Sequence, residues 1–198
     1  MLPFGIEHRD FGGTRRRCGS QLKPDPLCGP TLSGEELRSI LLGTAGLDAA
    51  VVVSLYLTLG RGNVESSPAQ LHSAVRLVVV AILLQAGHFA EEVTTGFHTR
   101  FPELLGLSAW SLGFFTSFNI AWLVIWSFSA LGLSARLHAA LFPIWFLGIG
   151  CAMNGIAHPL LSLITGAYFP GLVTSPLVGL AGVMLLRHLL RLTAHATA

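Results

Sequence analysis

The sequence has little charge for its length. Only 11% of its 198 residues are Asp, Glu, Lys or Arg, whereas about 25% is typical of a soluble globular chain. No charged residue occurs from 104 to 135, and none occurs in the 50 residues from 137 to 186. Because one helical crossing of a bilayer needs about 20 apolar residues, the longer stretch holds two crossings. The charge deficit excludes an ordinary soluble fold and predicts a multi-pass membrane protein.

Other absences exclude other classes of protein. The net charge is only +2 and no basic stripe alternates with aromatic residues, so nucleic acid is excluded as a partner. No glycine-rich phosphate loop follows a predicted strand. The three cysteines, Cys18, Cys28 and Cys151, are odd in number, and the first two lack the spacing of a zinc knuckle or redox pair. We therefore expect free thiols.

Five apolar segments are predicted to cross the membrane. They cover approximately residues 37–59, 74–96, 109–133, 137–164 and 172–192. Because hydrocarbon offers the backbone no hydrogen-bond partners, each segment must be helical, and short connections make neighbours antiparallel. The predicted fold class is all-α, a polytopic membrane bundle of about five transmembrane helices in residues 35–198. Residues 1–34, rich in Arg, Pro and Gly, are predicted to form a flexible tail.

The distribution of basic residues predicts an orientation. Six of them lie at or before the start of the first span: Arg9, Arg15, Arg16, Arg17, Lys23 and Arg38. By the positive-inside rule the N-terminus is cytoplasmic, and five spans put the C-terminus outside, although Arg187 and Arg191 argue mildly for the reverse. We expect an integral membrane protein, located in the inner membrane if the source is a bacterium. The expected partners are membrane lipids, and a homodimer is one possible oligomeric state.

Small residues and prolines predict how the spans pack. Small side chains suit close helix contacts on the first span (Gly43, Gly46, Ala50) and on the fourth (Gly148, Ala152, Gly155). Proline inside a helix removes a hydrogen bond and kinks the axis. We therefore expect kinks at Pro143, Pro159 and Pro176, with an early end of the fourth span at Pro159 as the alternative.

Ionisable residues inside the spans are the candidates for function, because a charged side chain at mid-bilayer costs at least about 2.5 to 3.5 kcal/mol. His88, Glu91 and Glu92 lie on the second span. At about 100° per residue, Glu92 lies roughly 40° to one side of His88 and Glu91 roughly 60° to the other. Imidazole nitrogen and carboxylate oxygen both bind zinc and iron, so this face is predicted to supply half of a divalent-metal site.

The fourth span supplies the complement. Asn154 and His158 are four residues apart and share a helical face, and the second and fourth spans run in the same direction. The two faces are therefore predicted to meet at similar depth, with Tyr168 in the following turn reaching back over them. The predicted metal ligands are His88, Glu91, Glu92 and His158, and the predicted catalytic residues are Glu91, Glu92, Asn154 and Tyr168. Weaker candidates are Asp48, Asn119, Thr94, Thr95 and His98.

These residues carry a resemblance to a known family. The motifs His88-Phe-Ala-Glu91-Glu92, Asn154-Gly-Ile-Ala-His158 and Tyr168-Phe-Pro170-Gly171 occur in this order. They resemble the HXXEE, NXXXH and YXPG motifs of the HXXEE family of integral membrane proteins, over residues 37 to 192. The family is described as having unknown function, so the resemblance implies which residues matter without implying an activity. Pro170 and Gly171 are otherwise expected to act as turn formers only.

Several functions fit this pattern. The first is a metal-dependent intramembrane enzyme on a hydrophobic small molecule: one zinc ion would suit hydrolysis with a free carboxylate as base, and iron would suit oxygen-dependent chemistry. A metal-free acid and base catalyst is a second interpretation. A small proton or cation carrier or channel that uses the buried His and Glu residues is a third. A purely structural contact between the His and Glu side chains stays open as well.

Overall fold

The computed structural model describes residues 7–9, 15–17, 33–61, 63–64 and 66–194. Its contacts divide the chain into two units, Met1–Gly34 and Glu35–Ala198. In the first unit, β1 (Glu7–Arg9) pairs with β2 (Arg15–Arg17) in antiparallel fashion. Residues 1–6, 10–14 and 18–32 of the predicted tail, with Cys18 and Cys28, lie outside the described residues.

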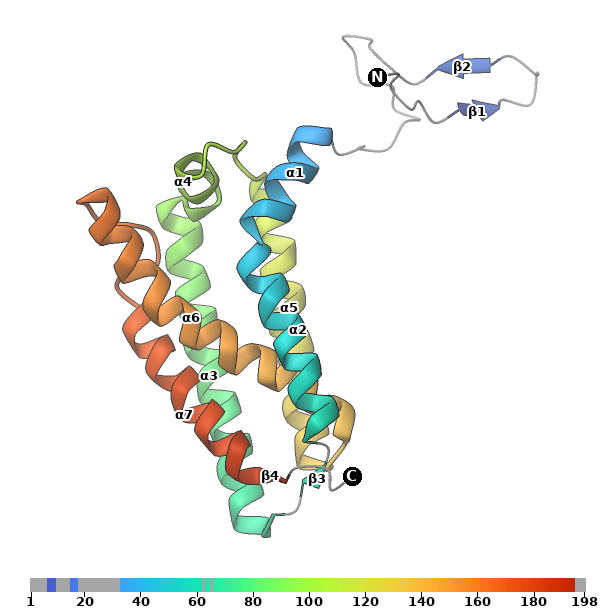
Figure 1. Ribbon diagram of the computed structural model, residues 1–198, viewed down its shortest axis with the longest axis vertical. Helices are drawn as coiled ribbons and strands as arrows, with labels where there is room; N and C mark the ends of the chain where they lie inside the picture. The colour runs from blue at the N-terminus through green and yellow to red at the C-terminus, as the bar shows by residue number, and fades with distance from the viewer. Residues whose placement is uncertain (1–6, 10–14, 18–32, 62, 65, 195–198) are drawn as a thin grey trace. The chain divides into compact units, whose positions relative to one another are not determined.

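The second unit is an all-α bundle, as predicted (Figure 1). Short α1 precedes the first long helix, and short α4 and the 3-10 turn η1 lie between long helices. The elements are α1 (Gly34–Gly43), α2 (Ala45–Gly60), α3 (Pro68–Thr95), α4 (Phe97–Leu104), α5 (Leu112–Ser134), η1 (His138–Ala140), α6 (Leu141–Thr165) and α7 (Ser175–Leu192). Two short strands, β3 (Asn63–Val64) and β4 (Thr193–Ala194), pair and hold the C-terminal ends of α2 and α7 at the same end of the bundle.

The helices are suited to a membrane. Four are long and apolar enough to cross one: α3, α5, α7 and the continuous pair of η1 and α6. Helices α1 and α2 meet at a bend of 55° and would together form a fifth span. Large apolar side chains such as Val52, Phe128 and Leu163 are exposed on the outer faces, where a bilayer would cover them. The structure therefore agrees with a multi-pass membrane protein.

Local sequence signals set where the helices begin. The Ser67 hydroxyl accepts a hydrogen bond from the backbone of Gln70, whose side chain bonds back to Ser67, and Pro68 occupies the first turn. This capping box starts α3 six residues before the predicted residue 74. Ser111 likewise accepts from the N–H of Phe114 and starts α5. Capping therefore starts α3 more than a turn earlier than hydropathy predicts, and it starts α5 at Leu112, three residues after the predicted residue 109.

Helices α6 and α7 share the most extensive helix contact in the described chain, and glycines permit it. A methyl group built on Gly155 would lie 2.5 Å from the Cα atom of Gly179, so the two backbones touch at this crossing. This confirms the packing role predicted for Gly155. Helix α6 continues through Pro159 to Thr165, so the alternative early end is wrong. Pro176 lies in the first turn of α7, where its missing N–H costs little.

Candidate metal centre

Three buried side chains from α3 and α6 converge near one end of the bundle. His88 and Glu92 lie one turn apart on α3, and His158 lies on α6; their exposed fractions are 0%, 6% and 2%. The Nε2 atoms of the two histidines are 3.2 Å apart. Glu92 Oε1 lies 3.5 Å from His88 Nε2 and 3.4 Å from His158 Nε2. The second and fourth spans therefore meet, as predicted, and these three residues form a group that could hold a metal ion.

Hydrogen bonds on the far side of the His88 ring fix its proton. The Nδ1 atom of His88 lies 2.7 Å from the Thr174 hydroxyl, and that hydroxyl donates to Glu91 Oε2 at 2.6 Å. Since the Thr174 proton is directed to Glu91, the Thr174 oxygen must accept from His88, and Nδ1 must carry a proton. We assign the tautomer from this network. The Nε2 atom of neutral His88 then presents a lone pair to the group.

The same logic applies to His158. Its Nδ1 atom lies 2.5 Å from the carbonyl oxygen of Pro170, and a carbonyl oxygen can only accept a hydrogen bond. Nδ1 of His158 is therefore protonated, and Nε2 of the neutral ring is not. The two ring planes are nearly perpendicular, at 86°.

Three electron-pair donors consequently face one another without a proton assigned between them. Two imidazole nitrogens and one carboxylate oxygen, all within 3.5 Å, repel unless a cation or an additional proton lies among them. Nδ1–H groups bound to protein oxygen and Nε2 atoms turned inward are the usual arrangement of metal-binding histidines, since the outer hydrogen bond fixes the ring. The donor set therefore fits a divalent metal.

Glu91 lies outside this group in the structure. Its carboxylate accepts hydrogen bonds from the backbone N–H groups of Val173 and Thr174, both at 2.9 Å, and from the Thr174 hydroxyl. These groups stand at the start of α7, where the helix dipole favours an anion. Glu91 was predicted as a metal ligand; here its contacts make it the residue that holds Thr174 against His88.

Tyr168 reaches over the site from the turn between α6 and α7, as the sequence suggested. Its hydroxyl donates a hydrogen bond to Glu91 Oε1 at 2.7 Å. Partial burial and the contact with the Glu91 carboxylate raise the pKa of Tyr168, so the phenol remains a neutral donor at physiological pH. Tyr168 therefore binds Glu91, and not the group of His88, Glu92 and His158 itself.

The turn residues do more than reverse the chain. Pro170 supplies the carbonyl oxygen that binds His158. Gly171 has a left-handed φ of 86°, and a methyl group built on it would lie 2.5 Å from His158 Nδ1 and 2.8 Å from His88 Cε1. The two imidazole rings thus pack directly on the glycine, a role beyond the turn formation expected from the sequence.

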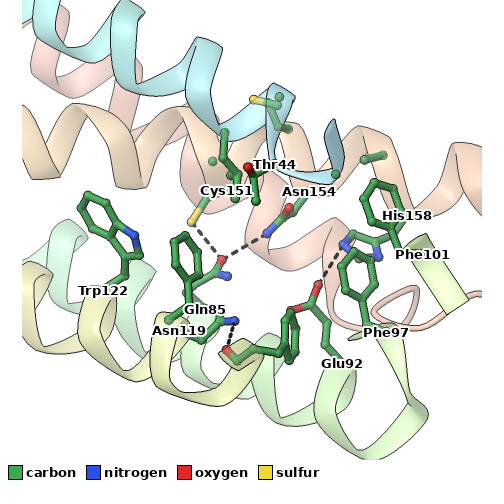
Figure 2. Close-up of a pocket in the computed structure, with 18 of the residues that line it drawn as sticks. Thr44, Gln85, Glu92, Phe97, Phe101, Asn119, Trp122, Cys151, Asn154 and His158 are labelled. Carbon is green, nitrogen blue, oxygen red and sulfur yellow. Dashed lines mark hydrogen bonds and ion pairs between the residues drawn. The ribbon is translucent and has the colours of Figure 1, made fainter. Parts of the chain in front are cut away.

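A cavity of about 210 Å³ opens beside the group. Glu92 and His158 line one end of it, and Phe97 and Phe101 from α4 lie close by, as Figure 2 shows. Residues of the bend between α1 and α2 contribute as well, among them Gly43 and Thr44. A polar group in this cavity would therefore have direct access to Glu92 and His158.

Asn154 lines the cavity but does not touch the group. Its side-chain nitrogen lies 3.5 Å from Gln85 Oε1, and the thiol of Cys151 points at the same oxygen, also at 3.5 Å (Figure 2). Gln85 and Thr174 were not predicted. Gln85 is an uncharged amide in an apolar span, a signal that a search limited to ionisable residues passes over; Thr174 carries no comparable signal.

The weaker candidates occupy other positions. Asp48 is exposed, and its carboxylate accepts from Thr44 at 3.4 Å. Asn119 lines the cavity and donates to the Phe115 carbonyl oxygen of its own helix. The hydroxyl groups of Thr94 and Thr95 donate hydrogen bonds to the backbone carbonyl oxygen of Glu91, on their own helix. The ring of His98 stacks on Phe115.

Comparison with family models, with curated proteins and with solved structures finds no match to this chain. The resemblance to the HXXEE family therefore remains a prediction from three motifs. The case for the site rests on its own distances and hydrogen bonds.

Proposed function

We propose that this membrane protein binds one divalent metal ion through His88 Nε2, Glu92 and His158 Nε2, and that it is a metal-dependent intramembrane enzyme for a hydrophobic substrate. One observation carries the proposal. The outer hydrogen bonds to Thr174 and Pro170 leave both Nε2 atoms unprotonated and 3.2 Å apart, with a carboxylate oxygen beside them.

The donor set supports zinc or iron. Two histidines and one carboxylate with an open position occur in catalytic zinc sites and in non-haem iron sites. A metal bound here would supply Lewis-acid chemistry and, as iron, redox chemistry. Because Glu92 and His158 line the cavity, the open position would face a molecule held there.

Roles for the other residues follow from their contacts. Glu91 and Thr174 orient His88, and Tyr168 holds Glu91 in place. The sequence suggested that a free carboxylate would act as the general base in hydrolysis. The Glu91 carboxylate already accepts four hydrogen bonds, so it is poorly suited to that role. Asn154 lies in the cavity beside Gln85, where it would contact substrate. The predicted HXXEE membership belongs to this proposal, since its three motifs contain the proposed ligands and Tyr168.

The same distances are also compatible with the second interpretation, a metal-free acid and base catalyst. If one Nε2 atom carried an extra proton, the separation of 3.2 Å between the histidines would be an N–H···N hydrogen bond, and Glu92 would balance the charge. The two interpretations differ in whether the purified protein contains metal, and this difference decides between them.

The test is the metal content of protein purified in mild detergent, measured by elemental analysis. We expect about one zinc or iron per chain, and loss of at least nine-tenths of it in His88→Ala, His158→Ala and Glu92→Gln, because removal of one of three ligands is severe. Matched controls are His72→Ala and Glu103→Gln, exposed residues of the same types, which should retain the metal. A wild-type protein without stoichiometric metal, after growth with zinc and iron supplied, would refute the proposal.

A further inference from the structure

We propose that the cavity beside the metal centre binds an uncharged lipid with a long aliphatic chain and a single hydroxyl group, with the hydroxyl held by Gln85 and Asn154. This inference names the substrate class of the proposed enzyme and rests on that proposal for the chemistry. The binding itself needs only the cavity.

The walls favour an apolar chain. The lining carries nine aromatic side chains: Phe97, Phe101, Trp110, Phe114, Phe115, Phe118, Trp122, Trp126 and Phe146. On α6 the lining residues run from Phe146 to Leu161, which corresponds to roughly 22 Å along the helix axis at 1.5 Å per residue. A cavity of only about 210 Å³ spread along this length suits a slender chain better than a bulky ring system.

The charges exclude the common lipid headgroups. The described lining contains no lysine or arginine, the side chains that usually bind phosphate and carboxylate. Its acidic residue is Glu92, so without metal the cavity repels anions. A fatty-acid carboxylate, or the phosphate of a phospholipid headgroup, including that of a phospholipid with a quaternary ammonium group, would enter without a cationic partner. An uncharged ligand is left.

The amide pair selects a hydroxyl group. One hydrogen bond joins Asn154 Nδ2 to Gln85 Oε1. Within the part of the chain that the structure describes, Gln85 Nε2 and Asn154 Oδ1 have no hydrogen-bond partner, although both side chains line the cavity. The pair thus offers one free donor group and one free acceptor. A hydroxyl group both donates and accepts, whereas a hydrocarbon would leave both amide atoms unpaired.

The positions of Gln85 and Asn154 would place the hydroxyl group of the ligand close to the metal centre. Asn154 is one helical turn from His158 on α6, and Gln85 is about one turn from His88 on α3. Phe146 lies on α6 about two turns before Asn154, on the side away from His158, and the rings of Trp122 and Trp126 on α5 pack against it. From Asn154 to Phe146, α6 advances roughly 12 Å. The half of the aliphatic chain next to the hydroxyl would therefore lie against these rings, and the other half would extend beyond the cavity, with the hydroxyl end about one turn from His158.

Tryptophan fluorescence tests the inference, because three of the four tryptophans line the cavity and bromine quenches them on contact. The probes are 9,10-dibromo-octadecanol, 9,10-dibromo-octadecane, 9,10-dibromo-octadecanoate and a phosphatidylglycerol with the same dibromo chains, added to purified protein. The protein is first treated with a chelator. We expect half-maximal quenching by the alcohol at a concentration about tenfold lower than by the alkane, and weaker quenching by both anions.

The variant Gln85→Leu/Asn154→Leu should lose the preference for the alcohol, because no amide atom is left unpaired by the alkane. The alkane should quench this variant at least as strongly as the wild type, which also shows that the cavity is intact. Equal quenching by alcohol and alkane in the wild-type protein, or stronger quenching by either anion, overturns the inference without any variant. Because the protein is metal-free, this result does not depend on the metal content. Failure here and failure of the metal proposal are therefore distinguishable.

Discussion

Each buried histidine of the site uses one ring nitrogen to bind the protein and turns the other inward. The outer partners, Thr174 and the Pro170 carbonyl, are not ligands, yet they decide which nitrogen carries a lone pair. Glu91 acts through Thr174, because its carboxylate accepts the hydrogen bond that the Thr174 hydroxyl donates. The metal affinity should therefore depend on residues that never touch the ion.

Thr174→Val tests this dependence. The substitution keeps the shape of the side chain but removes the oxygen that accepts from His88 Nδ1, so the ring loses its fixed tautomer. We expect the metal affinity, measured by competition with a chromophoric chelator, to fall about 10- to 100-fold. Thr174→Ser keeps the hydroxyl and should stay close to wild type. Equal affinities for the two variants would show that Thr174 does not orient His88.

Gly171→Ala tests the packing of the rings on the turn. The added methyl would meet both histidines, and an Ala residue at φ 86° is strained as well. Gly166→Ala is the matched control, since Gly166 also has a positive φ, of 65°, but has no neighbour within 4 Å of the added methyl. We expect both variants to melt at lower temperature and only Gly171→Ala to lose metal. Retention of metal by Gly171→Ala would contradict the described contact.

The sequence predicted the three proposed metal ligands better than the residues that hold them in place. His88, Glu92 and His158 stand out because ionisable side chains are expensive in an apolar span. The different surroundings of Glu91 and Glu92 could not be predicted, because both carboxylates flank His88 on the helix and only the start of α7 binds Glu91. Thr174 was missed for the same reason: its role exists only once the turn folds back.

At the scale of elements, the site depends on how closely α6 approaches α7. The turn that carries Pro170 and Gly171 joins these two helices, so a change in their crossing moves it relative to His158. Gly155→Ala places a methyl against Gly179 and should separate the helices, which lowers both the melting temperature and the metal affinity. Gly150→Ala on the same helix meets nothing within 4 Å and should lower neither. Equal behaviour of the two variants would show that the crossing does not support the site.

The predicted helices were right in kind and inexact in extent. Apolar runs predict where a span lies, but capping by Ser67 and Ser111 sets where α3 and α5 begin. The segment 98–108 was predicted as a connection, yet α4 forms there and brings Phe97 to 5.4 Å from the His158 ring, between centroids. Short helices of this kind lack the long apolar run that identifies a span.

At the scale of the whole molecule, the number of crossings sets the sides on which the ends lie. We propose that α1 and α2 form one bent span, which gives five crossings, and that the N-terminus is cytoplasmic. Single cysteines placed at Ala167 and after Ala198, in a Cys-free chain that still binds metal, should react with a membrane-impermeant maleimide from opposite sides, with Ala167 on the cytoplasmic side. Reaction from the same side would contradict the topology of α7 as a span.

X-ray absorption at the edge of the bound metal is the most direct test that His88, Glu92 and His158 bind the ion. It reports the atoms around the ion in the intact wild-type protein. We expect two imidazole nitrogens and one carboxylate oxygen at about 2.0–2.2 Å, with the remaining position filled by a light atom. Any metal retained by His158→Ala should show one imidazole fewer. A protein with no metal, or with metal that shows no imidazole signature, would contradict this assignment of the ligands.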